Sequence, residues 1–243
     1  MKTILLVIVI IFMHSNASFS QVISDCNPGG CSTPFTSSST TFTMPGFPGC
    51  TITVYFLHRI CNGKEEVEIQ TIGYNNPPDI GCTSFLTWLY DPLYTVDHVN
   101  QLWWTAEEEA AKFLFLGYYN SLPPTSKFLL QCPNGYYNYD FYKSACNHYC
   151  GYTDNYHNKL QIVQLACSTS ICCKIEYKIC WNTTTQQMDV VKTTTRIGGT
   201  ISCPTTPPVC PSTYPVPGAF LTGQLPDPME STGFSTPCVA GCE

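Results

Sequence analysis

The chain has 243 residues and a formal net charge of -6, with only 11 Lys and Arg, so it offers no basic surface for nucleic acid. All 16 cysteines lie beyond Asp25, and an even, high cysteine count favours disulfides formed in an oxidising compartment. A chain of this length can bury a core without crosslinks, so we expect the bridges mainly to staple loops.

Residues 1–20 are typical of a secretory signal peptide. One Lys precedes the apolar run Ile4 to Met13, and small and polar residues follow it. This run is too short to span a membrane, and the later sequence has no apolar run of about 18 residues. We therefore expect a secreted, extracellular or periplasmic protein, or one of the cell envelope, with no transmembrane segment. Cleavage after Ser20 and cleavage after Ala17 are both open.

Residues 21–49 predict an extended N-terminal arm, because Ser, Thr, Pro and Gly dominate its composition. Within it, Thr40 to Met44 is a candidate edge strand, since Thr and Phe suit a pleated surface.

Residues 50–82 predict a β-hairpin. Apolar side chains alternate from Ile52 to Ile60, and Asn62-Gly63 is the strongest sequence signal for a two-residue turn. Such a turn fixes the register, which we expect to pair Cys61 with Lys64, Arg59 with Glu66, His58 with Val67, and Phe56 with Ile69.

Residues 167–203 predict a second hairpin of similar design. Side chains alternate from Ile171 to Cys180, a polar turn spans Asn182 to Gln187, and Met188 to Ile197 is the returning strand. Aligning Cys180 with Cys61 superimposes the two patterns, which suggests an internal duplication or two similar sheets on a shared core. The alternative is that any two amphipathic hairpins look alike.

The segment between Cys82 and Cys132 has no cysteine and predicts one helical insert, at about residues 96–118. Ala106 to Tyr118 is its strongest part, because Thr105 and Glu108 fit a capping box and acidic residues suit a first turn. Gly117 and then Pro123 are expected to end it.

Residues 132–157 combine tyrosine with Asn, Asp and Gly, a composition that is typical of recognition loops. We interpret this stretch as a contact surface for a glycan or a protein, with plain packing of the rings across a bridged loop as the alternative. The candidate binding residues are Tyr136, Tyr137, Tyr139, Tyr142, Tyr149, Tyr152 and Tyr156.

Other chemistries have weaker sequence signals. Cys146, His148, Cys150 and His157 match no strong zinc template, and export favours disulfides over thiolates, so we predict no metal and no cofactor. The motifs of serine hydrolases, zinc proteases, phosphate-binding loops and EF-hands are absent from the sequence. Asn182 begins an N-glycosylation sequon in the turn of the second hairpin, a surface location whose use depends on the host.

Residues 204–243 predict a Pro-rich C-terminal arm that runs over the body and is tied down by its cysteines. The predicted fold is therefore mainly β (α+β minor), with antiparallel hairpins in a sandwich-like body at residues 50–203 and an extended arm at each end. Vicinal Cys172 and Cys173 point to opposite faces and should have different partners. The expected disulfide cysteines are Cys26, Cys31, Cys50, Cys61, Cys82, Cys132, Cys146, Cys150, Cys167, Cys172, Cys173, Cys180, Cys203, Cys210, Cys238 and Cys242.

Three functional hypotheses follow from these patterns. The leading one is a non-enzymatic binding or structural protein that uses the tyrosine stretch and a free strand edge. The second is a secreted hydrolase of a polymer, with carboxylates from Asp140, Asp154 and one of Glu107, Glu108 and Glu109. The third is a self-assembling homo-oligomer in which a strand or an arm is exchanged between copies.

Overall fold

The structure is a computed structural model that describes residues 26, 31–75, 78, 80–155, 159–199, 202–215 and 228–242. The predicted signal peptide and Tyr156 lie outside the described residues.

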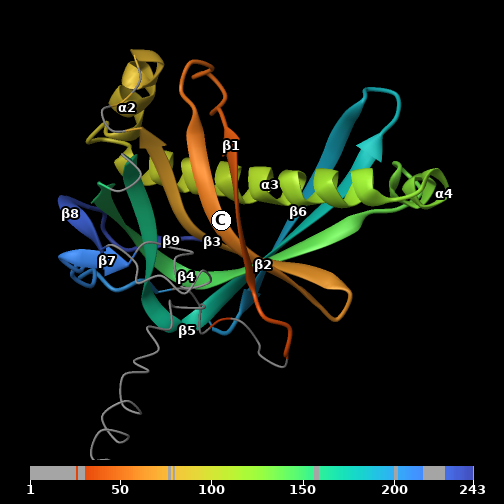
Figure 1. Cartoon of the computed structure of the whole chain (residues 1–243). Coiled ribbons are helices and arrows are strands. Elements are labelled where there is room, and N and C mark those ends of the chain that lie inside the picture. Colours follow the sequence, from red (N-terminus) through yellow and green to blue (C-terminus); the bar gives the residue numbers. More distant parts are fainter. Residues whose placement is uncertain are drawn as a thin grey trace, which may run out of the picture.

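The strands form one curled, mainly antiparallel sheet (Figure 1). Its order is β1-β2-β3-β5-β4-β8-β7, with β6 added beside β5 and β9 beside β4. This confirms a mainly β fold built from antiparallel hairpins. The strands are β1 Thr36–Phe42, β2 Ile52–Cys61, β3 Lys64–Asn75, β4 Tyr137–Asp154, β5 Lys159–Asn182, β6 Gln187–Ile197, β7 Thr213–Pro215, β8 Pro228–Ser235 and β9 Val239–Ala240.

The β2–β3 hairpin has the predicted register at all four predicted pairs. Asn62 and Gly63 both have positive φ, at 51° and 75°, as a two-residue hairpin turn of this kind requires. Arg59 donates from Nε to Oε2 of Glu66 over 2.7 Å, so the expected cross-strand ion pair is present. Local turn chemistry therefore fixes which face of this hairpin enters the core.

The second hairpin, β5–β6, also forms as predicted, with Asn182 opposite Gln187 at its turn. Both hairpins belong to the same sheet, and their common origin by duplication stays a prediction. The interpretation of residues 132–157 as an irregular loop is wrong. Residues 137–154 are strand β4, which pairs with β5 along most of its length because Tyr139, Phe141 and Tyr149 supply an apolar inner face.

The helical insert is longer than predicted. The main helix, α3, runs over Thr95–Ser121 and crosses the molecule from α2 to α4 (Figure 1). The predicted capping box is wrong, because Thr105 lies inside the helix and its hydroxyl donates to the Gln101 carbonyl. Gly117 does not end the helix; Leu122 does, since its extended conformation suits the residue before a proline. The shorter helices are η1 Ile80–Cys82, α2 Thr83–Leu89, α4 Pro124–Lys127 and η2 Phe128–Leu130.

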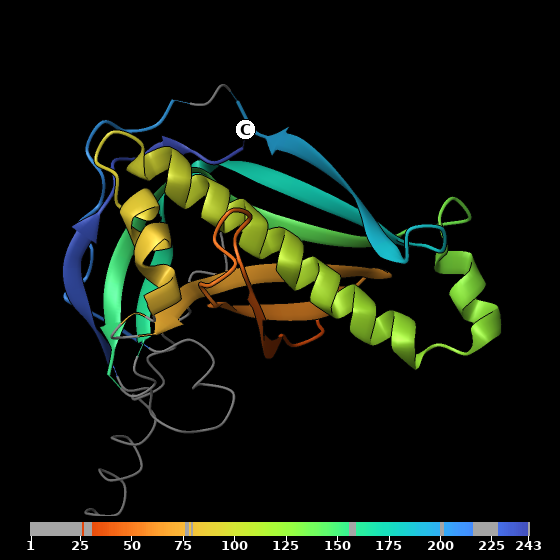
Figure 2. The same cartoon turned by 90° about the horizontal axis from the view of Figure 1, so that it is seen from above.

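The sheet curls because β3 has two different neighbours on the same side of the fold. Residues Glu65–Val67 pair parallel with β4, whereas residues Ile72–Asn75 pair antiparallel with β5. Since β4 and β5 are themselves paired, β3 must cross from the edge of one to the edge of the other. Figure 2 shows α3 lying between the β2–β3 hairpin and the β4–β6 strands, where its buried face completes the core.

Eight disulfides pair all 16 cysteines. Cys172 bonds Cys26 and Cys173 bonds Cys242, which confirms that the vicinal cysteines have different partners. The other bridges are Cys31–Cys61, Cys50–Cys82, Cys132–Cys180, Cys146–Cys203, Cys150–Cys210 and Cys167–Cys238. Such a set is consistent with an oxidising, extracellular location.

Both predicted arms add strands to the sheet. The N-terminal arm supplies β1, whose observed range starts and ends earlier than the predicted Thr40 to Met44. The C-terminal arm is tied to β4 and β5 by the bridges of its cysteines, and β8 and β9 pair with β4. Within the described ranges, no helix combines the length and the apolar character that crossing a membrane would need.

Candidate functional site

A polar cleft lies where β3 leaves β4 and approaches β5. The β3–β4 pairing stops at Val67 and the β3–β5 pairing begins at Ile72, so the intervening residues of β3 have neither β4 nor β5 as a ladder partner. On the opposite wall, the β4–β5 ladder shifts register between Ser144 and Asn147. Two interruptions of regular pairing therefore coincide and leave a gap in the sheet.

The cleft has a volume of about 70 Å³, which at about 30 Å³ for each water molecule in the liquid corresponds to roughly two water molecules. Trp103 and Glu107 of α3 contribute to its lining from the inner side of the sheet. Most of the lining groups from the strands are amides, carboxyls, hydroxyls or amines. The polar lining residues are Glu68, Gln70, Glu107, Tyr142, Lys143, Ser144, Asn147 and Gln164.

A buried ion pair forms part of this lining. The ammonium of Lys143 lies 2.7 Å from Oε1 of Glu107, and the two side chains are only 7% and 2% exposed. The hydroxyl of Tyr177 donates to the other oxygen of Glu107 over 3.3 Å. Because both charges are desolvated, each depends on the other, and the pair fixes α3 against β4 at the cleft.

Glu68 is half-buried and supplies the most perturbed carboxyl of the cleft. Burial raises its pKa to about 7, although a hydrogen bond from Gln70 and the charge of Arg59 act in the opposite direction. Near neutral pH this carboxyl is therefore partly protonated. It can both donate and accept hydrogen bonds, as recognition of a hydroxyl group requires.

Tyr149 links the cleft to the helix. Its hydroxyl donates to Oδ1 of Asn100 over 2.7 Å and accepts from Nε2 of Gln164 over 3.3 Å. Burial raises the pKa of Tyr149, with the charge of Glu107 adding to the effect, so the phenol stays neutral. Gln164 is thereby held in a fixed orientation at the cleft wall.

The structure divides the predicted tyrosines into three groups. Tyr139, Tyr149 and Tyr152 are buried in the body, so their rings serve packing in this structure. Tyr136 is 44% exposed, and Tyr137 packs on Tyr118 with ring centroids 4.7 Å apart. Tyr142 lines the polar cleft, and burial with nearby carboxylates raises its pKa to about 12. Tyr142 is thus the predicted binding residue that coincides with the cleft.

The carboxylates of the hydrolase hypothesis are each held by a partner. Glu107 pairs with Lys143, Asp140 lies 2.8 Å from the Lys174 ammonium, and Asp154 accepts from Gln161 over 2.7 Å. Glu108 and Glu109 both pair with Lys112, on the helix surface. Each of the five named carboxylates is therefore engaged by a lysine ammonium or, at Asp154, by a side-chain amide.

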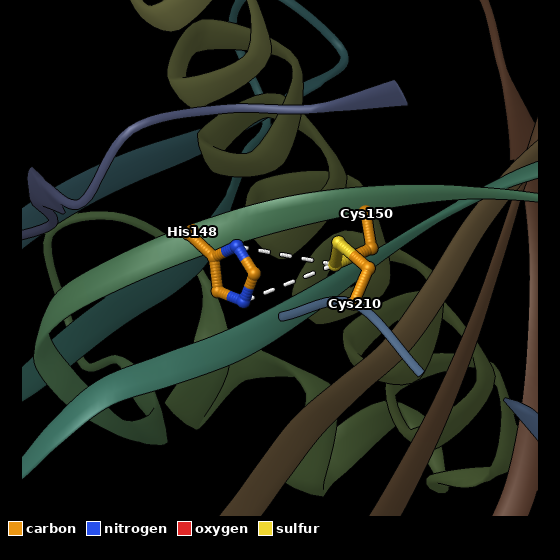
Figure 3. Close-up of side chains that lie close together, drawn as sticks. All are labelled: His148, Cys150 and Cys210. Carbon is orange, nitrogen blue, oxygen red and sulfur yellow. Dashed lines mark hydrogen bonds between the residues drawn. A yellow bond between two sulfur atoms is a disulfide. The ribbon is translucent and has the colours of Figure 1, made fainter. Parts of the chain in front are cut away.

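The weak metal signal at Cys146, His148 and Cys150 also resolves into disulfides. Cys146 bonds Cys203, and Cys150 bonds Cys210. Figure 3 shows the His148 ring directed at this second bridge, with the Cys150 sulfur 3.8 Å from Nε2. Burial lowers the pKa of His148, so the ring is neutral. The three His, Cys and carboxylate clusters in the described chain each contain a bridged cysteine pair, and a bridged sulfur cannot act as a thiolate ligand.

Sequence reasoning missed most of the cleft. Gln70, Asn147 and Gln164 lie on three strands, and they meet only because β3 crosses between β4 and β5. A local signal did exist for β4, since Tyr137, Tyr139 and Phe141 alternate with Asn138, Asp140 and Tyr142. That alternation indicates a strand with one polar and one apolar face.

The chain is thus a disulfide-rich, mainly antiparallel β protein with a polar cleft in its sheet. Comparison with known proteins found no match to a protein-family model, to a curated protein or to a solved structure.

Proposed function

We propose that this protein is a secreted or cell-envelope binding protein whose polar cleft takes the hydroxyl groups of a ligand, such as those at one edge of a sugar in a glycan. The observation that carries the proposal is the lining of the cleft, which combines two carboxyls, amides and a phenol with the aromatic surface of Trp103 and Phe141. Pockets for small ligands commonly pair an apolar wall with a few oriented polar groups.

The chemistry of individual residues supports a sugar more than an anion or an apolar ligand. Glu68 and Glu107 are unfavourable for an anion, and Lys143 is already neutralised by Glu107. Gln164 and Asn147 present amide groups that both donate and accept. Tyr142 lies half-buried in the lining, where the face of its ring can stack on the C–H groups of a sugar.

Isothermal titration of the mature, oxidised protein, after a glycan-array screen, tests this proposal. Tyr142→Ala should weaken binding of the selected glycan about tenfold, which is the loss expected from about 1.4 kcal/mol of stacking and contact energy. Tyr136→Ala is the matched control, because Tyr136 is exposed and outside the cleft, and it should leave the affinity unchanged. Equal losses in both variants, or no loss in Tyr142→Ala, would contradict the proposal.

Self-assembly is a second candidate, supported by strand β6. Within the described sheet β6 pairs with β5 only, and most of its side chains are exposed, including Val191 at 48%. An edge strand of eleven residues is a template for pairing with another chain. In light scattering, a homo-oligomer that dissociates in Val191→Lys would support this candidate, and a monomeric wild-type protein would exclude it.

A further inference from the structure

Three side chains on neighbouring strands form a hydrogen-bonded chain outside the cleft. Oγ of Ser38, on β1, lies 3.1 Å from Nε2 of His58, on β2. Nδ1 of the same ring lies 2.7 Å from Oε1 of Glu65, on β3. Because β1 pairs with β2 and β2 with β3, the sheet itself holds the three groups in line.

The hydrogen-bond partners determine the tautomer of the neutral ring. The Glu65 carboxylate can only accept, so Nδ1 of His58 carries the proton. Nε2 is then the basic nitrogen, and it accepts the hydrogen bond donated by the Ser38 hydroxyl. This is the arrangement in which an imidazole acts as general base toward a serine and a carboxylate orients it.

The three side chains differ in their exposure to solvent. The His58 side chain is 21% exposed and that of Glu65 is 9% exposed, while Ser38 is half-buried on an edge strand. The nucleophile and the base are therefore accessible, whereas the carboxylate is shielded from water. In the described sheet β1 pairs with β2 only, so alternate backbone N–H groups of the strand that carries Ser38 point away from β2.

An apolar surface lies beside the imidazole. The Phe56 ring centroid is 6.0 Å from that of His58 and 6.2 Å from that of Phe113. Phe113, on α3, is 45% exposed and can contact a bound acyl group. We propose that Ser38, His58 and Glu65 form a serine-hydrolase site that cleaves carboxylic esters with small apolar acyl groups.

In the first step, the Ser38 Oγ attacks the ester carbonyl carbon while its proton passes to Nε2 of His58. The tetrahedral intermediate then expels the alcohol, which takes the proton back from Nε2, and leaves an acyl group on Ser38. In the second step, water attacks this acyl-enzyme and gives a proton to Nε2. Collapse releases the carboxylic acid and returns the proton to Ser38, so the site needs no cofactor or oxidant.

Two probes applied to the mature, oxidised protein test the site. A fluorophosphonate should lose fluoride and form a phosphonyl ester at Ser38, which peptide mass spectrometry locates. p-Nitrophenyl butyrate should be hydrolysed above the buffer rate. Both reactions should be lost in Ser38→Ala and retained in Ser37→Ala, since Ser37 is exposed and points to the opposite face of β1.

Glu65→Gln separates orientation of the imidazole from simple packing. Because Glu65 is a positioning residue, Glu65→Gln should lower kcat about 100-fold or more and leave KM nearly unchanged. Glu65→Asp should restore part of that loss. Absence of label at Ser38 in folded wild-type protein would overturn the proposal, as would hydrolysis in Ser38→Ala equal to that of the wild type. The labelling of wild-type protein does not depend on whether any variant folds.

Discussion

The buried ion pair between Glu107 and Lys143 gives the sharpest stability prediction. At 2.7 Å and an effective dielectric constant of 20, the gross attraction is about 6 kcal/mol. Desolvation of two side chains that are 2% and 7% exposed cancels much of it, so the pair adds little net stability. Losing one partner leaves an uncompensated buried charge, which costs about 3–5 kcal/mol.

We therefore expect Glu107→Leu and Lys143→Met each to lower the free energy of unfolding by about 3–5 kcal/mol. Lys143→Met should lie at the low end, because Tyr177 and the charge of Lys192 still act on Glu107. The double variant should lose far less than the sum, since it buries no unpaired charge. Urea unfolding without reductant measures all four proteins, and the double-mutant cycle gives the coupling energy. A coupling below about 0.5 kcal/mol would refute this account of the pair.

Three further predictions test other parts of the structure. Glu68→Gln should raise the thermal midpoint above that of the wild type at pH 8 but not at pH 4.5. Burial raises the folded-state pKa of Glu68 to about 7, so the wild type loses stability as the pH rises from 4.5 through 7. An equal midpoint of the two proteins at pH 8 would count against this prediction. Gly63→Val should lower the free energy of unfolding in urea by about 1–2 kcal/mol, because φ is 75° there; an unchanged midpoint would argue against the observed turn. Thr105→Ala should leave the stability of the helix, followed by circular dichroism, unchanged or slightly higher. A loss of about 1 kcal/mol in stability would restore the capping-box interpretation.

The features that the sequence predicts correctly are those set by short-range chemistry. Asn62-Gly63 determines the register of β2–β3 from Cys61 to Phe56, because a two-residue turn allows one pairing, and a shift between Phe56 and Tyr55 then changes the register beyond it. Alternation sets the faces of β5, and vicinal Cys172 and Cys173 must then diverge toward different bridges. The sequence also predicts the helix at about residues 96–118, close to the observed Thr95–Ser121, although the capping box that it suggests at Thr105 is wrong.

What the sequence does not predict depends on contacts between distant segments. β4 pairs with β3, β5, β8 and β9, so Tyr139, Tyr149 and Tyr152 are buried by neighbours that no local pattern identifies. The polar cleft exists because β3 changes partner between Val67 and Ile72, a change that also curls the sheet and that joins segments far apart in the chain. The contact of Ser38 with His58 likewise requires the N-terminal arm to pair as β1, and no hydrolase motif in the sequence signals it.

Nuclear magnetic resonance mapping of glycan binding tests the central claim most directly. Titrating the selected glycan into labelled protein should shift the indole N–H of Trp103 and the side-chain amides of Gln70, Asn147 and Gln164, all of which line the polar cleft. The signals of Phe128 and Tyr136, which are exposed outside the cleft, should not move. Shifts confined to that outer surface, with the cleft amides unmoved, would contradict the account.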